Sequence, residues 1–129
     1  MATFNIKSAL DAYFIANWNM VTTPIQFQGT VIAPTTDTWL GLVYSPSYND
    51  TYGLDGTATG RIEYMGNLKV FCYAKNATQA YVLADSVKTF LNGLQLTDIY
   101  LQIGQDGTAT DMGNGYFECL ASFPLQQFA

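Results

Sequence analysis

Apolar residues recur at helical spacing near the start of this chain. The spacing i, i+4, i+7 and i+8 brings one set of side chains onto a single helix face: Ile6, Leu10, Tyr13, Phe14 and, one turn later, Trp18. Thr3 is a suitable N-cap, and Pro24 ends any helical stretch that reaches it. The pattern therefore predicts a first helix ahead of Pro24.

A second helix is predicted from Ala77 to about Asn92. Its apolar stripe consists of Ala80, Leu83, Ala84, Val87, Phe90 and Leu91. Asn76 and Gln79 form a suitable capping box at its start. Gly93 stands where a left-handed residue commonly ends a helix.

Alternating patterns predict the strands. They cover residues 25–28, 38–44, 61–74, 98–105 and 116–124, and a polar connection of about sixteen residues separates the second from the third. Gly66 and Asn67 suggest a bulge or bend within 61–74. Beyond that point Leu68, Val70 and Cys72 share one face, while Phe71 and Tyr73 lie with Lys69 on the other. Bulky side chains on both faces predict a strand covered on two sides, by the chain's own helices and by a neighbouring subunit.

The predicted order of elements is α-β-β-β-α-β-β, in one domain that spans residues 1–129. Strands joined by loops, with two amphipathic helices to cover them, indicate the α+β class. We expect a single mixed or antiparallel sheet with both helices on one face and with long hairpin loops. Residues 38–44 should pair antiparallel with 61–73, and residues 98–105 with 116–124.

The pentapeptide DGTAT occurs twice, at residues 55–59 and 106–110, and each copy lies between two predicted partner strands. Asp and Gly are turn formers, so the two copies are interpreted as acidic hairpin tips, which also carry Asp50 and Asp111. An EF-hand loop requires oxygen ligands where both copies have Thr. A weak calcium site built from Asp106, Asp111 and backbone carbonyls remains the alternative.

Composition favours a partner protein. Hydrophobic residues make up 49% of the chain and charged residues only 12%, about half the usual charged share. Apolar surface in excess on a small domain is usually buried against another subunit. The net charge is −5 and the five cations are scattered, so direct nucleic acid binding is not expected.

Cysteine usage and the N-terminal pattern predict a soluble intracellular protein. Cys72 and Cys119 stand alone in apolar surroundings, which favours free buried thiols, with a single disulfide as the alternative. The N-terminal segment has neither the charge pattern of a signal peptide nor the length of a membrane span.

The residues needed for common catalytic sites are missing from the sequence. The chain has no histidine, which excludes Ser-His-Asp and Cys-His catalysis, and it has no phosphate-binding glycine motif. Glu63 and Glu118 alternate with apolar residues on strands, as solvated or salt-bridged carboxylates do. We therefore expect neither an enzyme nor a bound cofactor or metal.

Several stretches of the sequence resemble the small tail terminator proteins of long-tailed bacteriophages, the group related to minor tail protein U of phage lambda. The matching landmarks are IKSALDAYF, PIQFQG followed by IAPTTDTWLGLVY, GNLKVFCY leading into ATQAYVLADSVKTFL, and GYFECLASFPLQ. The resemblance implies a ring of six subunits that caps the tail tube, stops its polymerisation and offers a surface to neck proteins. It implies a place in the virion after assembly in the host cytoplasm, with DNA passing through the lumen without specific binding and with no membrane contact.

On this interpretation, a set of strand and loop residues would form subunit contacts or face the lumen: Asp50, Tyr52, Asp55, Arg61, Glu63, Phe71, Tyr73, Asp106 and Asp111. A head-completion or head-tail joining protein of the neck is the close alternative. A small-ligand binding module with an aromatic cavity is the more remote one.

Overall fold

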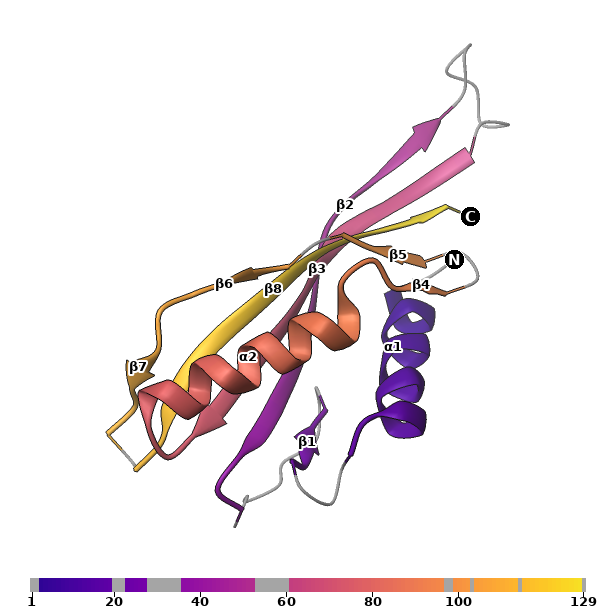
Figure 1. Ribbon diagram of the computed structural model, residues 1–129. Coiled ribbons are helices and arrows are strands. Elements are labelled where there is room, and N and C mark those ends of the chain that lie inside the picture. Colours follow the sequence, from indigo (N-terminus) through magenta and orange to yellow (C-terminus); the bar gives the residue numbers. More distant parts are fainter. Residues whose placement is uncertain are drawn as a thin grey trace.

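The computed structural model describes residues 3–19, 23–27, 36–52, 61–96, 99–102, 104–113 and 115–128. Figure 1 shows two helices and a curved sheet. The elements, in chain order, are α1 (Thr3–Asn17), β1 (Ile25–Gln26), β2 (Trp39–Tyr52), β3 (Arg61–Ala74), α2 (Ala77–Leu91), β4 (Gln95–Leu96), β5 (Ile99–Leu101), β6 (Gln105–Asp106), β7 (Thr110–Asp111) and β8 (Phe117–Phe128).

The strands form one mixed sheet in the order β1-β2-β3-β8-β5-β4, and β6 and β7 pair with β8 beside β5. β1 runs parallel to β2, and every other pairing is antiparallel. The predicted α+β class and the two predicted antiparallel pairings are confirmed.

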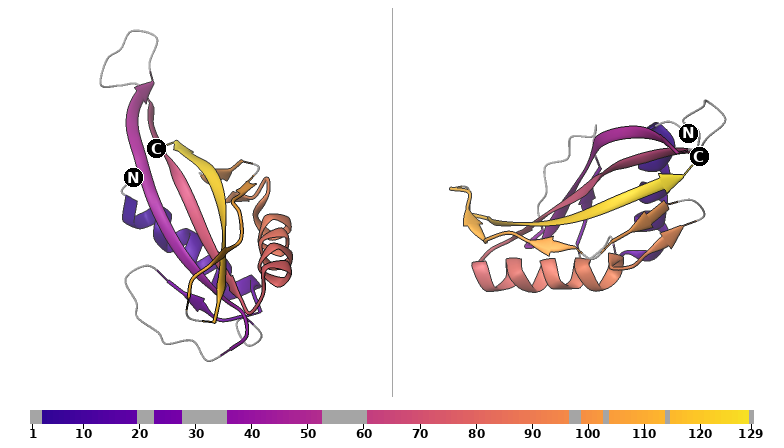
Figure 2. Two further views of the ribbon diagram at one scale, coloured as in Figure 1. Left: turned by 90° about the vertical axis from the view of Figure 1, so that its left-hand side faces the viewer. Right: turned by 90° about the horizontal axis from the view of Figure 1, so that it is seen from above.

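The buried side chains of the long strands all belong to one face of the sheet, called the inner face below. They are Leu40, Leu42 and Tyr44 of β2, Leu68, Val70, Cys72 and Ala74 of β3, and Cys119, Ala121, Phe123 and Leu125 of β8. Both helices contribute to the same core, through Leu10 and Phe14 of α1 and through the buried stripe of α2. Figure 2 shows the strands curving past α2, which lies along one side of the sheet.

The helix ends follow the local sequence. α2 begins after Asn76, whose side-chain oxygen accepts a 2.9 Å hydrogen bond from the backbone N–H of Gln79. Gly93 follows the helix with φ of 70°, the left-handed conformation that a side chain would strain. These features confirm the predicted cap and end of the second helix. α1 starts at Thr3, so Thr3 is the first residue of the helix and not the N-cap that the pattern predicts.

The predicted polar connection after residue 44 is wrong over half of its length. β2 continues to Tyr52 and pairs with β3 as far as Arg61. The predicted bulge occurs beside Gly66 but on the partner strand, because the register shifts in β2 between Pro46 and Tyr48, which pair with Gly66 and Met65. Proline lacks a backbone N–H for the ladder, which explains why the irregularity lies beside Pro46.

The predicted strand at residues 98–105 is interrupted. β5 and β6 are separate because the backbone at Gly104 approaches the ring of Phe123, where a Cβ would lie 2.4 Å from Cε1. Phe123 is fully buried and cannot move aside. Only glycine fits at position 104, and the chain changes direction there.

The hairpin formed by β2 and β3 extends past both helices, and the end of β8 runs beside it (Figure 1). The register records this arm as Tyr52 opposite Arg61 and Glu63 opposite Phe128. The first DGTAT copy, predicted to form the tip of this hairpin, lies outside the described residues.

Candidate functional site

The candidate site is the outer face of the sheet, the face that points away from the helices. Strand alternation and register place its side chains in four rows: Trp39–Tyr73–Glu118, Gly41–Phe71–Leu120, Val43–Lys69–Ser122 and Ser45–Asn67–Pro124. Each of these residues is half-buried or exposed, whereas their strand neighbours on the inner face are buried. The outer face therefore remains accessible in the single chain.

An aromatic cluster occupies one end of the outer face. The rings of Trp39 and Tyr73, directly opposite each other on neighbouring strands, stack with centroids 4.0 Å apart and planes 10° apart. Tyr116 meets Trp39 edge-on at 6.3 Å, and its hydroxyl donates to the carbonyl of Thr36 at 2.8 Å. The ammonium group of Lys75 lies 4.0 Å from the centroid of the Tyr116 ring, a cation–π contact. Each ring is thus fixed by a neighbour, and the cluster is preorganised.

Tyr73 and Trp39 each contribute a polar hydrogen-bond donor to this cluster. The hydroxyl of Tyr73 donates a 2.6 Å hydrogen bond to Oε2 of Glu118. Burial raises the pKa of Tyr73, and the bond to Glu118 raises it further, so Tyr73 stays a hydrogen-bond donor at neutral pH. The indole Nε1 of Trp39 is buried and has no acceptor among the described residues. A buried donor without a partner is uncommon, so the indole N–H of Trp39 is available to an acceptor from outside the described residues.

Lys69 is the charge at the centre of the outer face. It stands between Val43 and Ser122 in the register and is half-buried. It forms no ion pair within the described part of the chain. A cation in an otherwise mostly uncharged surface makes an acidic partner the favourable one.

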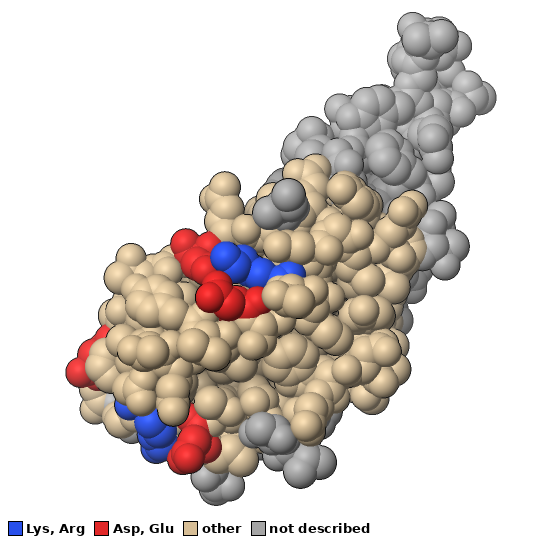
Figure 3. Space-filling model, viewed as in Figure 1, with Lys and Arg blue, Asp and Glu red and all other residues tan. Residues whose placement is uncertain are grey.

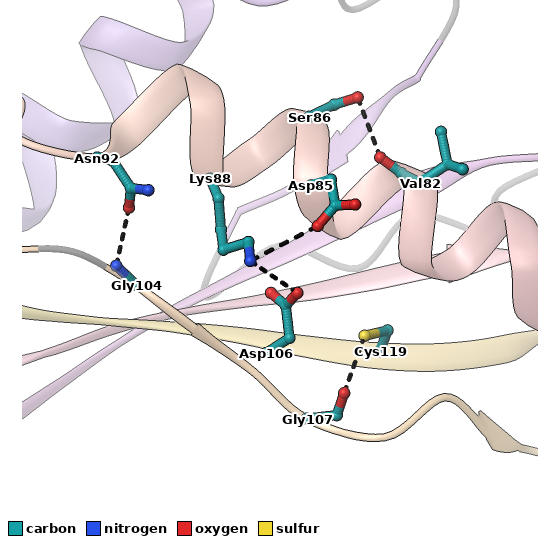
Figure 4. Close-up of polar contacts among 9 residues, drawn as sticks. All are labelled: Val82, Asp85, Ser86, Lys88, Asn92, Gly104, Asp106, Gly107 and Cys119. Carbon is teal, nitrogen blue, oxygen red and sulfur yellow. Dashed lines mark hydrogen bonds and ion pairs between the residues drawn. The ribbon is translucent and has the colours of Figure 1, made fainter.

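The second DGTAT copy lies along α2 and is not a free hairpin tip, which corrects the prediction. Asp106 pairs with Lys88 at 2.9 Å, and Lys88 also lies 3.5 Å from Asp85 (Figure 4). Asn92 accepts a 2.8 Å hydrogen bond from the N–H of Gly104. The side chain of Asp106 is only 22% exposed, and its hydrogen bond is the main cause of the raised pKa of Lys88. The predicted open acid is therefore paired.

Further bonds hold the rest of this segment. The hydroxyl of Tyr81 accepts from the N–H of Ala109 at 2.9 Å. The N–H of Gly107 donates to the carbonyl of Leu120 at 2.7 Å, and the thiol of Cys119 donates to the carbonyl of Gly107 at 3.4 Å. The segment 104–109 is thus fastened both to α2 and to β8.

The turn itself lies at residues 112–115. The N–H of Met112 donates to the carbonyl of Tyr116 at 3.0 Å, and Gly113 and Gly115 have φ of 78° and 88°. Asp111 accepts from the N–H of Gly113 at 2.9 Å, which is an Asx turn. Asp106 and Asp111 therefore have separate partners. Within the described ranges no three His, Cys, Asp or Glu side chains gather as metal ligands would.

The two cysteines are free, as predicted, and lie opposite each other on β3 and β8. Burial raises the pKa of both thiols. A thiol with a raised pKa stays protonated at neutral pH and is a poor nucleophile or metal ligand. Cys72 and Cys119 therefore act as small apolar core residues.

The predicted site residues separate into three groups. Phe71 and Tyr73 lie on the outer face. Asp106, in the segment fastened to α2 and β8, and Asp111, at the end of β7, form the second group. A third group lies in the paired arm, where Asp50 is opposite Glu63 and Tyr52 is opposite Arg61. Asp55 falls outside the described residues. The contributions of Trp39, Tyr116 and Glu118 were missed, although alternation along β2 and β8 would have identified two of them.

One further surface feature among the described residues is a hollow beside α2. A shallow hollow of about 220 Å³ lies between α2 and the segment that follows α1, lined by Trp18, Asn19, Thr23, Leu83 and Ser86. Small-molecule sites usually measure ~300–1,000 Å³. On the surface seen in Figure 3, charged atoms form small groups separated by uncharged residues. Neither described helix has the length and apolar character needed to cross a membrane.

Comparisons with models of known protein families and with curated proteins give no match for this sequence.

Proposed function

We propose that this protein is a structural, non-catalytic ring subunit of a bacteriophage neck, a tail terminator. The outer face is the observation that carries the proposal. One side of the sheet forms a core with the helices, while the other presents stacked aromatic rings, a buried indole donor and a cation, Lys69, that has no ion pair among the described residues. Such a face suits burial against another protein better than contact with water.

The sequence landmarks support the choice of partner class. They resemble tail terminators in the first helix, in β2, in the passage from β3 into α2 and in β8. The hairpin arm of β2 and β3 supports the same proposal, because it extends past the helices and can reach a neighbouring protein (Figure 1). In the ring, the low charge of the chain would keep the lumen from binding DNA.

Two measurements test the proposal: the mass of the particles that the protein forms, and its effect on the length and ends of tail tubes. The protein, alone and with purified tail tube protein, should form particles of about six times the 14.2 kDa protomer mass, as measured by mass photometry. Added to growing tubes, it should also shorten them and cap one end in negative-stain images. A protein that stays monomeric with tubes present and leaves their length unchanged is not a terminator.

Two variants link the test to the outer face. Phe71→Ser should weaken ring formation and capping because it places a hydroxyl in the middle of the face. Ile15→Ser is the matched control, because Ile15 is an exposed apolar side chain, 61% accessible, on α1 and away from the four rows of the outer face. Capture of head-completion protein without any effect on tubes would instead favour a head-tail joining role.

A further inference from the structure

The outer face and the exposed side of α2 are complementary, and they lie on opposite sides of the molecule. We propose that neighbouring copies of this chain associate face to back, so that the outer face of one copy receives the exposed side of α2 from the next. The inference rests on the proposed ring function and names the surface that each copy contributes. The pairing centres on Lys69 of one copy and Asp85 of the next.

The exposed side of α2 has the shape for such a contact. Thr78, Val82, Asp85, Ser86 and Thr89 are all exposed, and they form one stripe at helical spacing. The stripe has small side chains, and Val82 is its apolar member, 58% exposed. A narrow stripe of small residues allows the helix to approach the half-buried rings and aliphatic groups of a sheet closely.

The charges on the two surfaces also favour contact between the outer face of one copy and α2 of the next. Asp85, Lys88 and Asp106 form a cluster with one negative charge in excess, and the side chain of Asp85 is 69% exposed. Lys69 on the outer face has no ion pair within the described residues. Bringing these surfaces together places opposite charges next to each other.

The alternative two-fold contact is disfavoured by the same charges. Packing two outer faces against each other would bring Lys69 of one copy towards Lys69 of its partner, and like charges in one interface repel. Face-to-back contact is heterologous, and repeated heterologous contacts generate either a closed ring or an open chain. The two surfaces therefore suit a ring better than a dimer.

A charge exchange tests the pairing in the full-length protein. Lys69→Glu and Asp85→Lys should each weaken self-association by roughly tenfold, as measured by sedimentation velocity and mass photometry. The combination of both changes should recover most of the loss, because it restores opposite charges with their positions exchanged. The control is Lys69→Glu with Asp111→Lys, which has the same net charge as the combination and should not recover.

Cross-linking gives a second, independent readout. Lys69→Cys with Asp85→Cys should give a ladder of disulfide-linked species under mild oxidation by oxidised glutathione, whereas either single cysteine should give no ladder. The native Cys72 and Cys119 are buried and should not contribute. A strong dimer from Lys69→Cys alone would show that the outer faces pair with each other and would overturn the inference.

The two proposals fail differently. Rings that form and cap tubes normally in both single charge variants would refute the face-to-back contact and leave the terminator function standing. Rings that obey the charge exchange but never affect tail tubes would refute the function and leave the contact standing.

Discussion

The inner and outer faces of the sheet are made by the same three strands, yet they follow different chemical rules. On β3, Leu68, Val70 and Cys72 point inward and are at most 2% exposed. Their alternating neighbours Phe71 and Tyr73 point outward and remain half-exposed. Bulk is similar on both sides, so size alone does not separate them. The difference lies in charge: Lys69 and Glu118 stand in the described rows of the outer face, whereas the buried side chains of the inner face are uncharged.

This comparison indicates that the inner face mainly stabilises the fold and that the outer face mainly contributes to association. An inner-face side chain gains about 1.5–3 kcal/mol from full burial and determines whether the chain folds. An outer-face side chain gains only part of that amount in the single chain. The remainder becomes available when a partner covers it, so outer-face substitutions should affect association more than folding.

The largest expected difference compares one phenylalanine from each face. Phe123→Ala should lower the free energy of unfolding by about 3–5 kcal/mol, because Phe123 is fully buried and its removal leaves a cavity. Phe71→Ala should lower it by only about 1 kcal/mol, because the ring is half-exposed. Urea denaturation followed by circular dichroism measures both.

The comparison is useful only if both variants unfold in one transition. Equal denaturant slopes for the two variants and for the unsubstituted protein would show that the unfolded states are comparable. Equal losses of stability from both substitutions would mean that the outer face is already part of the core, and the division between the faces would be wrong.

Stability at alkaline pH should also distinguish the inner face, which carries the two thiols, from the outer face, which carries Tyr73. The pKa values of Cys72 and Cys119 are raised above their ordinary value of 9.0, and that of Tyr73 is raised above 10.0, with burial as the main cause in each case. The folded state therefore holds these protons more tightly than the unfolded state does. Stability is fully present below pH 9, declines first as the unfolded thiols ionise, and declines again above pH 10.

Two sets of variants show which side chains cause each part of this loss of stability. Cys72→Ala with Cys119→Ala should remove the part that begins near pH 9, and Tyr73→Phe should reduce only the part above pH 10. The measurement is the urea midpoint between pH 7 and pH 11. A midpoint that does not change from pH 8 to pH 10 would show that the inner-face thiols have ordinary pKa values.

The sequence predicted those elements whose signals are local. β3 and α2 are found at or within one residue of the expected bounds, because strand alternation and the Asn76 cap are determined by neighbouring residues. The continuation of β2 to Tyr52 was not predicted. Most of its residues are polar turn formers in isolation and become a strand only by pairing with Arg61–Asn67. The break at Gly104 depends on Phe123, nineteen residues away along the chain.

In the candidate site, too, the features that depend on neighbouring residues were predicted and those that depend on distant residues were not. Alternation alone placed Phe71 and Tyr73 on a second face of their strand. The aromatic cluster required the register, because Trp39 and Glu118 reach Tyr73 only across two strand pairings. Whether Asp106 is paired could not be predicted locally, because its partner Lys88 belongs to a different element, α2. Acidic residues near glycines indicate a turn, but they do not reveal whether the carboxylate is paired.

The smallest expected effect concerns Asp111, which was predicted as an open acidic contact and which makes an Asx turn with Gly113. Asp111→Asn keeps the accepting oxygen and should change neither stability nor ring formation. Asp111→Ala loses the bond and should cost about 0.5–1 kcal/mol, with faster hydrogen exchange at the Gly113 amide. The two variants remove the same charge, so the difference between them isolates the hydrogen bond. If Asp111→Asn instead weakened the ring as much as Phe71→Ser does, the 112–115 turn would belong to the interface, and the contact surface would extend beyond the outer face.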